Sequence, residues 1–385
     1  MKEGWQTKKL GECTEVIAGQ SPEGAFYNAS GEGLPFYQGK KDFGERFIGA
    51  PTTWTTQTTK VALEGDILMS VRAPVGPVNF ATEKSCIGRG LAAIRSRNGL
   101  DRNFLFYFLR SKQDEICGTE GAVFASINKN DIQQIQIAAP PLPEQRRIVG
   151  ILDEAFEGIA TVKANTEKNL QNTRALFESF LESVFTRRGE GWIEKSLGEV
   201  CEVKDGTHDS PKYVDNGIPF VTQKNIREDG LSFEKTKFIS QEDHNNFYRR
   251  SNASRGDILI SMIGANRGMA CIVDDERTFS IKNVGLVKQN PSINQQFLLY
   301  FLKSAQAASF VRSASKGGAQ EFVGLTELRR FPVPLPPLGS QSTLAGQFQF
   351  LREKTRHLAS VYEQKLAALE ALKKSLLHQA FTGQL

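Results

Sequence analysis

The sequence predicts an α+β protein with two globular segments of mixed helix and strand in tandem repeat, separated by a long antiparallel two-helix coiled coil. Three observations support this fold class. Two long stretches, 140–185 and 336–381, carry apolar residues at alternating steps of three and four, the heptad pattern of a helix that packs on another helix. The second stretch repeats the first at a constant offset of 196 residues. The segments that precede the two stretches also repeat each other.

The heptad stripe of the first stretch consists of Ile148, Leu152, Ala155, Ile159, Val162, Leu176, Phe180 and Val184. Its repeat consists of Leu344, Phe348, Leu351, Thr355, Leu358, Tyr362, Leu369, Leu372, Leu376 and Ala380. Thr166, Asn169 and Thr173 interrupt the first stripe in its middle. Each helix would be roughly 60 Å long at ~1.5 Å per residue. Two such helices most simply pack on each other, and the alternative is that each packs on its own globular segment.

Proline pairs mark where both helices begin. Pro140-Pro141-Leu142 recurs as Pro336-Pro337-Leu338, and Gln145 recurs as Gln341. Two consecutive prolines cannot continue a helix from upstream, so a new helix is expected to start at each pair. Pro143 and Glu144 suit the first turn of the first helix. Gly189-Glu190-Gly191 is expected to close that helix.

The two globular segments share short motifs. Leu10-Gly11-Glu12 recurs as Leu197-Gly198-Glu199, and Gly65-Asp66-Ile67-Leu68 recurs as Gly256-Asp257-Ile258-Leu259. The offset drifts from 187 to 196 residues, which indicates that the two halves differ by small loop insertions. The chain therefore divides into four parts, with boundaries at 1–139, 140–188, 189–335 and 336–385.

Each globular segment is expected to mix strands and helices. Strands are predicted at 15–18, 66–71, 77–81 and 91–94 from apolar runs bounded by turn residues. A helix is predicted over 101–111, capped by Asp101, because Phe104, Leu105, Phe108 and Leu109 follow helical spacing. Residues 131–137 are expected to form a short strand or a turn. The matching elements of the second segment follow from the repeat.

Composition indicates an ordinary soluble globular protein. Of the 385 residues, 39% are hydrophobic and 24% are charged, and the net charge of +5 is only weakly basic. The first residues contain no apolar run, so we expect no signal peptide, and no stretch approaches the ~18 apolar residues that a membrane span needs. The five cysteines are scattered and never form a C-x-x-C pair, which favours free thiols in a reduced, cytoplasmic setting and argues against a zinc site.

The sequence lacks the motifs of common enzymes. The four histidines, His208, His244, His357 and His378, do not stand at metal-ligand spacing and are expected to be surface or packing residues. No P-loop motif is present. Neither proline pair has the flanking residues of an amino-methyltransferase motif. We therefore expect a non-catalytic binding protein with no cofactor and no metal.

The repeated motifs resemble a known family. Two globular segments and two long helices, the first entered through Pro140-Pro141-Leu142-Pro143-Glu144-Gln145, resemble the specificity subunit of type I restriction-modification enzymes. The Leu-Gly-Glu openings and the Gly-Asp-Ile-Leu segments are similar as well. The resemblance covers essentially the whole chain. The second helix departs from the motif, because Gly339 and Ser340 replace the Pro and Glu found in the first.

The resemblance implies a division of labour. Residues 1–139 and 189–335 would be target recognition domains that each read one half of a bipartite site on double-stranded DNA. The helices at 140–188 and 336–385 would set the spacer between the half-sites. Methyltransferase (modification) subunits would dock along the helices, and a restriction translocase-nuclease subunit would join the full complex. The specificity subunit itself would catalyse nothing.

Polar and basic residues on the loops that differ between the two segments are the candidates for DNA contact. Arg, Asn and Gln can pair with base edges, and Lys mainly contacts phosphate. The candidates in the first segment are Gln38, Lys40, Lys41, Arg46, Arg72 and Arg89. Those in the second are Lys212, Lys224, Asn225, Arg227, Arg249, Asn266, Arg267 and Asn283. A non-catalytic two-headed protein–protein adaptor is the alternative function.

Overall fold

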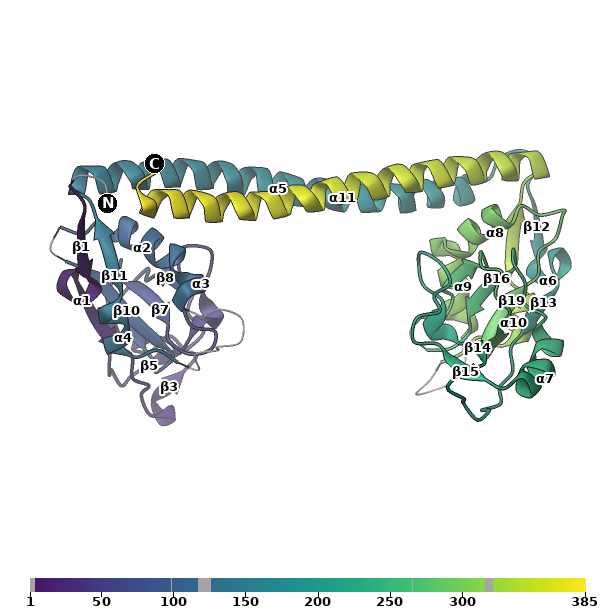
Figure 1. The fold of residues 1–385 in the computed structure, drawn as a ribbon, viewed down its shortest axis with the longest axis horizontal. Coiled ribbons are helices and arrows are strands. Elements are labelled where there is room, and N and C mark those ends of the chain that lie inside the picture. The colour runs from purple at the N-terminus through teal and green to yellow at the C-terminus, as the bar shows by residue number, and fades with distance from the viewer. Residues whose placement is uncertain (1–3, 98, 117–125, 265, 316–320) are drawn as a thin grey trace. The chain divides into compact units, whose positions relative to one another are not determined.

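The computed structural model describes residues 4–97, 99–116, 126–264, 266–315 and 321–385 (Figure 1). The chain forms two compact units. Unit 1 contains Met1–Thr166 and Gln364–Leu385, and unit 2 contains Glu167–Glu363. Each unit combines one globular domain with sections of both long helices. We call the globular part of unit 1, up to residue 139, domain 1, and residues 189–335 of unit 2 domain 2.

The described part of domain 1 forms three β-sheets. β1 (Gln6–Lys9) pairs antiparallel with β11 (Gln136–Ala139). A second sheet has the strand order β2–β10–β7–β8, and a third has the order β3–β5–β4–β9–β6. The strands of these sheets are β2 (Thr14–Ala18), β3 (Tyr27–Asn28), β4 (Leu34–Tyr37), β5 (Trp54–Thr55), β6 (Val61–Ala62), β7 (Ile67–Ser70), β8 (Val78–Phe80), β9 (Ser85–Ile87) and β10 (Leu91–Ser96). The helices are α1 (Leu10–Cys13), η1 (Gly24–Phe26), η2 (Lys40–Asp42), α2 (Arg102–Ser111), α3 (Gln113–Ile116) and α4 (Lys129–Gln134).

Helix α2 packs its apolar side chains between the four-stranded sheet and the long helices. Phe104 and Phe106 are fully buried in a core that also contains Ile148 of the first long helix and Leu377 of the second. Asp101 caps α2, since its Oδ1 accepts hydrogen bonds from the backbone N–H groups of Asn103 and Phe104 at 2.8 and 3.1 Å. The predicted helix and its cap are confirmed.

Domain 2 repeats this arrangement with local differences. Its four-stranded sheet has the order β13–β19–β16–β17, which matches β2–β10–β7–β8 of domain 1. A three-stranded sheet has the order β15–β14–β18, and β12 pairs with β20. The strands are β12 (Ile193–Ser196), β13 (Val203–Asp205), β14 (Ile218–Val221), β15 (Lys237–Ile239), β16 (Ile258–Ser261), β17 (Ala270–Ile272), β18 (Ser280–Ile281), β19 (Val284–Val287) and β20 (Pro332–Leu335). The helices are α6 (Leu197–Val200), η3 (Gln223–Asn225), α7 (Gln241–Ser251), α8 (Gln295–Leu302), α9 (Ala305–Ala314) and α10 (Leu325–Arg329).

The two long helices are α5 (Leu142–Arg187) and α11 (Leu338–Thr382), of 46 and 45 residues. They pair antiparallel in each unit. In unit 1, Lys163 Nζ contacts Glu370 Oε1 at 2.8 Å, and in unit 2, Arg174 Nη2 contacts Glu363 Oε1 at 2.8 Å. The predicted coiled coil is confirmed, whereas the alternative of two helices that pack only on their own domains is wrong.

The middle of the predicted heptad stripe is wrong in detail. Val162 and Leu176, which the stripe includes, are 36% and 52% exposed. Thr166 and Thr173, which interrupt the predicted stripe, are buried. The reason is the seven-residue spacing of a coiled coil, in which positions seven residues apart face the partner helix in every heptad. Four residues have this spacing, namely Ile159, Thr166, Thr173 and Phe180. Each buried threonine donates its hydroxyl to the carbonyl four residues earlier, at 2.7 Å.

Two other expectations are resolved by the structure. The stretch 131–137 is α4 followed by β11, because Asn128 and Asp131 form a capping box that starts a helix there. Helix α5 ends at Arg187, just before the predicted Gly189. Each compact unit includes parts of both helices, so the four-part division of the sequence stays a prediction about function.

The described cysteines are free thiols. Cys13, Cys86, Cys201 and Cys271 are all buried, and Cys117 lies outside the described residues. Burial raises the pKa of the Cys201 thiol to about 11 and that of Cys271 to about 12. These side chains therefore behave as small apolar core residues.

Candidate nucleic-acid interface

Both domains place a loop at the same position in the fold. In domain 1 the loop follows β2, and Gly19 N donates to Leu91 O at 2.9 Å. In domain 2 the loop follows β13, and Gly206 N donates to Val284 O at the same distance. A Cβ at either glycine would lie 2.2 Å from a backbone carbonyl oxygen, so only glycine fits. The two loops are thus equivalent scaffolds, and the side chains that follow the glycines are free to differ.

In domain 1 this loop brings together two of the predicted contact residues. Ser21 Oγ donates to Gln38 Oε1 at 3.0 Å, and Arg89 N donates to Ser21 Oγ at 3.3 Å. The side chains of Gln38 and Arg89 are exposed. The Arg89 contact uses its backbone N–H and not its guanidinium. An amide can donate to or accept from base edges, whereas a guanidinium only donates. Sequence reasoning did not select Ser21, which aligns with His208 in the repeat.

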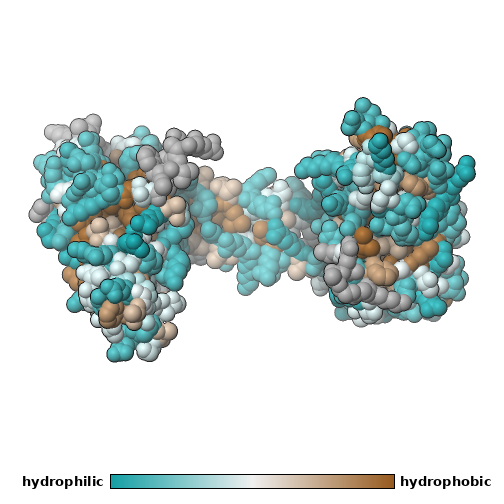
Figure 2. Space-filling view, turned by 90° about the horizontal axis from the view of Figure 1, so that it is seen from below, coloured by the Kyte–Doolittle hydropathy of each residue, from teal (hydrophilic) through white to brown (hydrophobic). Residues whose placement is uncertain are grey.

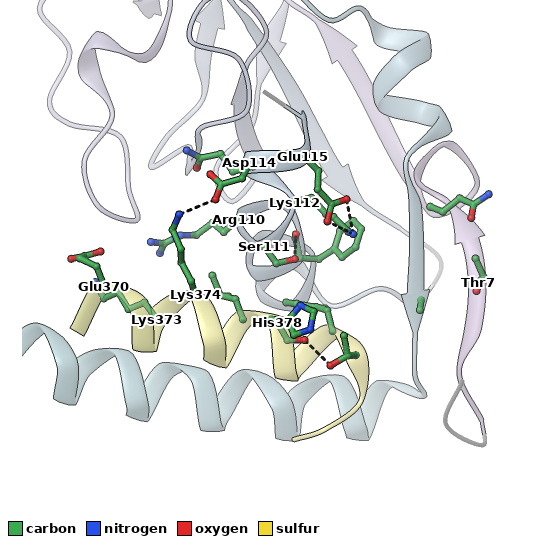
Figure 3. A pocket seen from close by; sticks show the side chains of 17 residues that line it. Thr7, Arg110, Ser111, Lys112, Asp114, Glu115, Glu370, Lys373, Lys374 and His378 are labelled. Carbon is green, nitrogen blue, oxygen red and sulfur yellow. Dashed lines mark hydrogen bonds and ion pairs between the residues drawn. The ribbon is translucent and has the colours of Figure 1, made fainter. Parts of the chain in front are cut away.

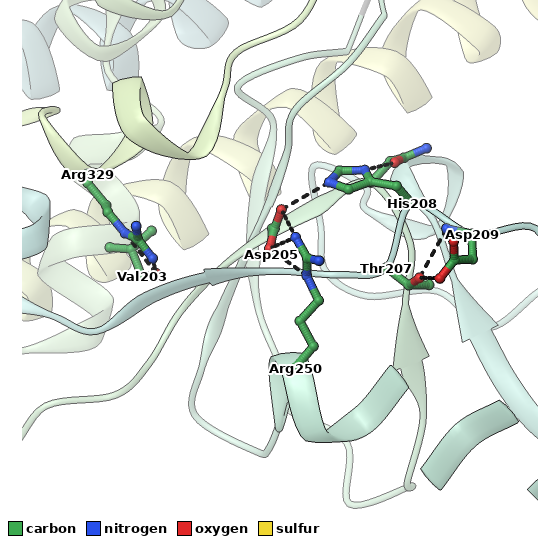
Figure 4. A network of polar contacts seen from close by, with 8 residues as sticks. Val203, Asp205, Thr207, His208, Asp209, Arg250 and Arg329 are labelled. Carbon is green, nitrogen blue, oxygen red and sulfur yellow. Dashed lines mark hydrogen bonds and ion pairs between the residues drawn. The ribbon is translucent and has the colours of Figure 1, made fainter. Parts of the chain in front are cut away.

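The equivalent site of domain 2 is a polar network around Asp205 (Figure 4). Arg250 on α7 donates to Asp205 Oδ1 through Nε and Nη2, at 3.0 and 2.8 Å. His208 Nε2 lies 3.2 Å from Asp205 Oδ2, and His208 Nδ1 lies 2.7 Å from Asn283 Oδ1. Asp205 is buried, whereas the His208 side chain is 61% exposed. The network holds an imidazole and an amide at the surface.

The predicted residues of domain 2 include Asn283, but not His208 or Arg250. His208 is expected from the sequence to be an ordinary surface or packing residue, because histidine spacing tests only for metal sites. The feature that could have found it is its place two residues after Gly206, at the repeat of Ser21.

Two predicted contact residues have other roles in the structure. Arg46 Nη1 contacts Asp153 Oδ1 of α5 at 2.6 Å, and Arg46 Nη2 donates to Asn103 Oδ1 at 3.1 Å. Asn225 is buried, and its Nδ2 donates to Ser232 O at 2.9 Å. Arg46 therefore joins domain 1 to α5, Asn225 supports a loop from within, and we leave both out of the proposed DNA contacts.

Among the remaining predicted residues, Arg267 is mostly buried. It donates to Gly264 O and forms an ion pair with Glu321, so we leave it out of the proposed DNA contacts as well. Arg227 is exposed and pairs with Glu234 at 2.9 Å. The other exposed members of the predicted set are Lys40, Lys41, Arg72, Lys212, Lys224, Arg249 and Asn266. The structure does not bring these residues into the loop sites described above.

A cavity of about 690 Å³ lies in unit 1 between α2, α3 and α11 (Figure 3). Cationic side chains line it, and two of the lysines are paired with carboxylates across the contact. Lys374 contacts Asp114 at 2.9 Å, and Lys373 contacts Glu45 at 2.9 Å. That hydrogen bond from Lys373 lowers the pKa of Glu45, and burial lowers the pKa of Arg110. The paired charges stabilise the contact between domain 1 and α11.

The described residues contain no group of three or more His, Cys, Asp or Glu side chains placed to hold a metal ion. No helix in the described part of the chain is long and apolar enough to cross a membrane.

The chain belongs to the family described as Type I restriction modification DNA specificity domain, which matches residues 2–172 and 189–359. The two matches cover both halves of the internal repeat. The family consists of specificity subunits, so this chain is a recognition subunit and not an enzyme.

Several known proteins are similar over the whole chain. The MjaVIII and MjaIX type I restriction enzyme specificity subunits of Methanocaldococcus jannaschii are 24% and 22% identical, over 100% and 99% of this chain and 93% of each relative. A third protein of that organism, named as the MjaX specificity subunit, is 41% identical over 178 residues. That match covers 45% of this chain and 41% of the relative.

Two solved structures share the fold. One, from work on complex assembly and conformational transition of the type I R-M system, has a TM-score of 0.81, with 21% identity over 100% of this chain and 99% of that one. The other is the HsdS subunit from Thermoanaerobacter tengcongensis, with a TM-score of 0.66 and 21% identity over 100% and 98%. The recognised resemblance and the predicted fold class are confirmed.

Proposed function

We propose that this chain is the sequence-specific DNA-binding subunit of a type I restriction-modification complex, in which each domain reads one half of a bipartite site. One observation carries the proposal. The four-stranded sheets of the two domains share one strand order and hold equivalent loops, but these loops present different side chains, with Ser21, Gln38 and Arg89 in domain 1 and His208 and Asn283 in domain 2. Loops with the same backbone position but different side chains would read two different DNA half-sites.

The proposed DNA contacts are the exposed predicted residues together with those of the loop sites. They comprise Ser21, Gln38, Lys40, Lys41, Arg72 and Arg89 in domain 1, and His208, Lys212, Lys224, Arg227, Arg249, Asn266 and Asn283 in domain 2. Glutamine, asparagine, histidine and arginine are proposed to contact bases, and lysine is proposed to contact phosphates.

An exchange of domains tests this function. Residues 1–139 are replaced by the corresponding domain of another specificity subunit, and the methylated sequence is mapped in cells that carry the complete system. We expect one half-site to change and the other to stay the same. A change in both half-sites would contradict independent reading by the two domains.

Salt dependence separates DNA binding from the alternative of a protein–protein adaptor. DNA affinity falls steeply with salt, because each neutralised phosphate releases counterions. We expect gel-shift affinity of the chain, measured with its methyltransferase subunit, to fall about 10³-fold or more between about 50 and 200 mM salt. An adaptor would show no DNA shift at either concentration.

The long helices are proposed to set the spacer between half-sites. A continuous helix of 46 residues is about 69 Å long, which is close to two turns of B-DNA at about 34–36 Å each. Thr166 and Thr173 are buried seven residues apart, so a seven-residue insertion between them, matched by one near Tyr362, would keep the seam in register. We expect the spacer to lengthen by about three base pairs while both half-sites stay the same. An unchanged spacer would refute this role.

The helices are also proposed to dock methyltransferase subunits, which a restriction subunit joins in the full complex. Figure 2 shows hydrophobic residues on the surface of the helical section of the molecule. The exposed large hydrophobic side chains of the two helices are Val162, Leu176, Leu338, Phe350, Leu358, Val361 and Leu372. Exposed apolar side chains gathered on one element are typical of a surface that a partner covers. The cytoplasmic location expected from the cysteine pattern stays a prediction.

A further inference from the structure

Helix α7 is an element that domain 2 has and the described part of domain 1 lacks. β15 pairs antiparallel with β14 in domain 2, as β5 pairs with β4 in domain 1. The connection that follows runs over residues 240–257 to β16 in domain 2, and over residues 56–66 to β7 in domain 1. The longer connection forms α7, whereas the shorter one forms β6 and contains no helix. The two domains therefore differ in a complete helix as well as in their loops.

The inner side of α7 is fixed to the three-stranded sheet of domain 2. Ser240 caps the start of the helix, since its side chain accepts a hydrogen bond from a backbone N–H of the first turn. His244 is buried, with Nδ1 2.9 Å from Ser280 Oγ of β18. The ring of Phe247 stacks on that of Phe220 in β14, with 5.8 Å between the centroids. These contacts hold the helix in one orientation and leave its other side facing solvent.

The outer side of α7 carries four exposed polar side chains. They stand at intervals of three, one and three residues, which places them on one face of the helix, and they are Glu242, Asn245, Asn246 and Arg249. The side chains of Asn246 and Arg249 make no hydrogen bond or ion pair with any other residue that the structure describes. Asn245 Oδ1 accepts from Gln241 Nε2 at 3.0 Å, which sets the orientation of the Asn245 amide. The outer face therefore offers hydrogen-bonding groups to a partner.

An ion pair joins α7 to the loop site of domain 2 (Figure 4). Arg250, in the last turn of α7, donates to Asp205 Oδ1 at 2.8 Å and to Asp205 Oδ2 at 2.9 Å. Asp205 is the buried centre of the network that contains His208 and Asn283. Arg249 is the next residue in the chain and is exposed. The outer face of α7 therefore begins beside the loop site.

We propose that α7 is a recognition helix that lies in the major groove of the second half-site, an inference that rests on the proposed DNA-reading function. The major groove is about 12 Å wide and admits an α-helix. The outer face runs from Glu242 to Arg249, a length of about 10 Å at ~1.5 Å per residue. That length matches about three base pairs at ~3.4 Å each.

The chemistry of the outer face suits base edges better than phosphates. Its one carboxylate and one guanidinium cancel in charge, whereas a face that binds the DNA backbone would be cationic. Arg249 can donate two hydrogen bonds to O6 and N7 of guanine, and Asn246 can pair with N6 and N7 of adenine. Glu242 can accept from the N4 amine of cytosine. Each of these side chains therefore distinguishes one base from the others.

The test selects duplexes from a random-sequence library with the full-length chain and its methyltransferase subunit, and compares wild type with Asn246→Ala and Arg249→Ala. We expect each variant to lose preference at one position of the same half-site by about 10-fold or more, the scale of one bidentate base contact. The two positions are expected to lie within about three base pairs of each other. The other half-site is expected to stay the same.

Matched controls make the same chemical changes elsewhere on the surface. Asn172→Ala and Arg146→Ala replace exposed side chains of α5, and both should select the wild-type motif. The urea midpoints of all four alanine variants should equal that of wild type, because every one of these side chains is exposed.

An exchange of hydrogen-bonding groups separates base reading from a structural role of Asn246. Asn246→Asp leaves a side chain of nearly the same shape that only accepts hydrogen bonds. We therefore expect the preference at the affected position to move from adenine to cytosine. A structural role would not create a new base preference.

The outcomes distinguish the recognition helix from the proposed function. Lack of any enriched motif with the wild-type chain would refute both together. A bipartite wild-type motif that Asn246→Ala and Arg249→Ala leave intact would overturn the recognition helix alone. Weaker binding with an unchanged motif would indicate phosphate contacts, and it would likewise overturn base reading by α7.

Discussion

Gln145 joins the start of helix α5 to the start of helix α2, and its removal should destabilise unit 1. The side chain is buried, with Oε1 accepting from Asp101 N at 2.8 Å. Nε2 donates to Pro140 O at 2.8 Å and to Gly99 O at 3.2 Å. Gln145→Ala leaves a buried N–H and a buried carbonyl without these partners. At about 1–3 kcal/mol for each unsatisfied group, we expect a loss of about 3 kcal/mol.

Chemical denaturation gives the free energy of unfolding, and hydrogen exchange of the α2 amides assigns the loss to unit 1. Gln171→Ala makes the same chemical change at an exposed position of α5 and should stay within about 0.5 kcal/mol of wild type. Gln341→Ala should weaken unit 2 instead, since Gln341 Oε1 accepts from Asn294 N at 2.9 Å and Nε2 donates to Pro336 O at 2.9 Å. A loss below about 1 kcal/mol for Gln145→Ala would refute this reasoning.

Three other predictions concern an ion pair, a buried histidine and a buried thiol. Asp153→Ala removes the partner of Arg46 and should cost about 2 kcal/mol of unfolding free energy, against almost none for exposed Glu154→Ala. Burial lowers the pKa of His244, so the unfolded chain binds more protons, and urea midpoints of unit 2 should fall as pH drops below about 6.5, less so in His244→Gln. Cys271, whose pKa burial raises to about 12, should escape thiol labelling at about pH 8 in the native chain and react after unfolding, as peptide mapping would show.

The internal repeat predicts most of the fold, because it reports on backbone positions that both halves need. At Gly19 and Gly206 a nearby backbone carbonyl leaves no room for a side chain. Gln145 and Gln341 each bind the backbone N–H of the residue that caps a neighbouring helix, in equivalent positions of the two halves. Such constraints act on the sequence directly. Asp101 is likewise visible, since a helix cap depends on residues within one turn.

The site is less predictable, because its contacts join distant segments. His208 and Asn283 are 75 positions apart, and neither belongs to a local motif. The charge of a loop residue also does not predict whether it contacts DNA or supports the fold. Arg46 is a basic loop residue like its neighbours, but its guanidinium is paired with Asp153 of α5, a contact that only the tertiary structure defines. The register in the centre of the coiled coil could not be predicted from the sequence either, because threonine is not expected at a core position.

Unit 1 is assembled from two pieces of chain that lie on either side of domain 2 in the sequence. Its core includes Leu377 and Ala380, and the ring of Phe381 lies 5.1 Å from that of Phe104. During translation, domain 1 must therefore wait with an uncovered apolar face until domain 2 has been made and residues 364–385 have left the ribosome. A chain that stalls before that point would expose a ready surface for aggregation or for a chaperone.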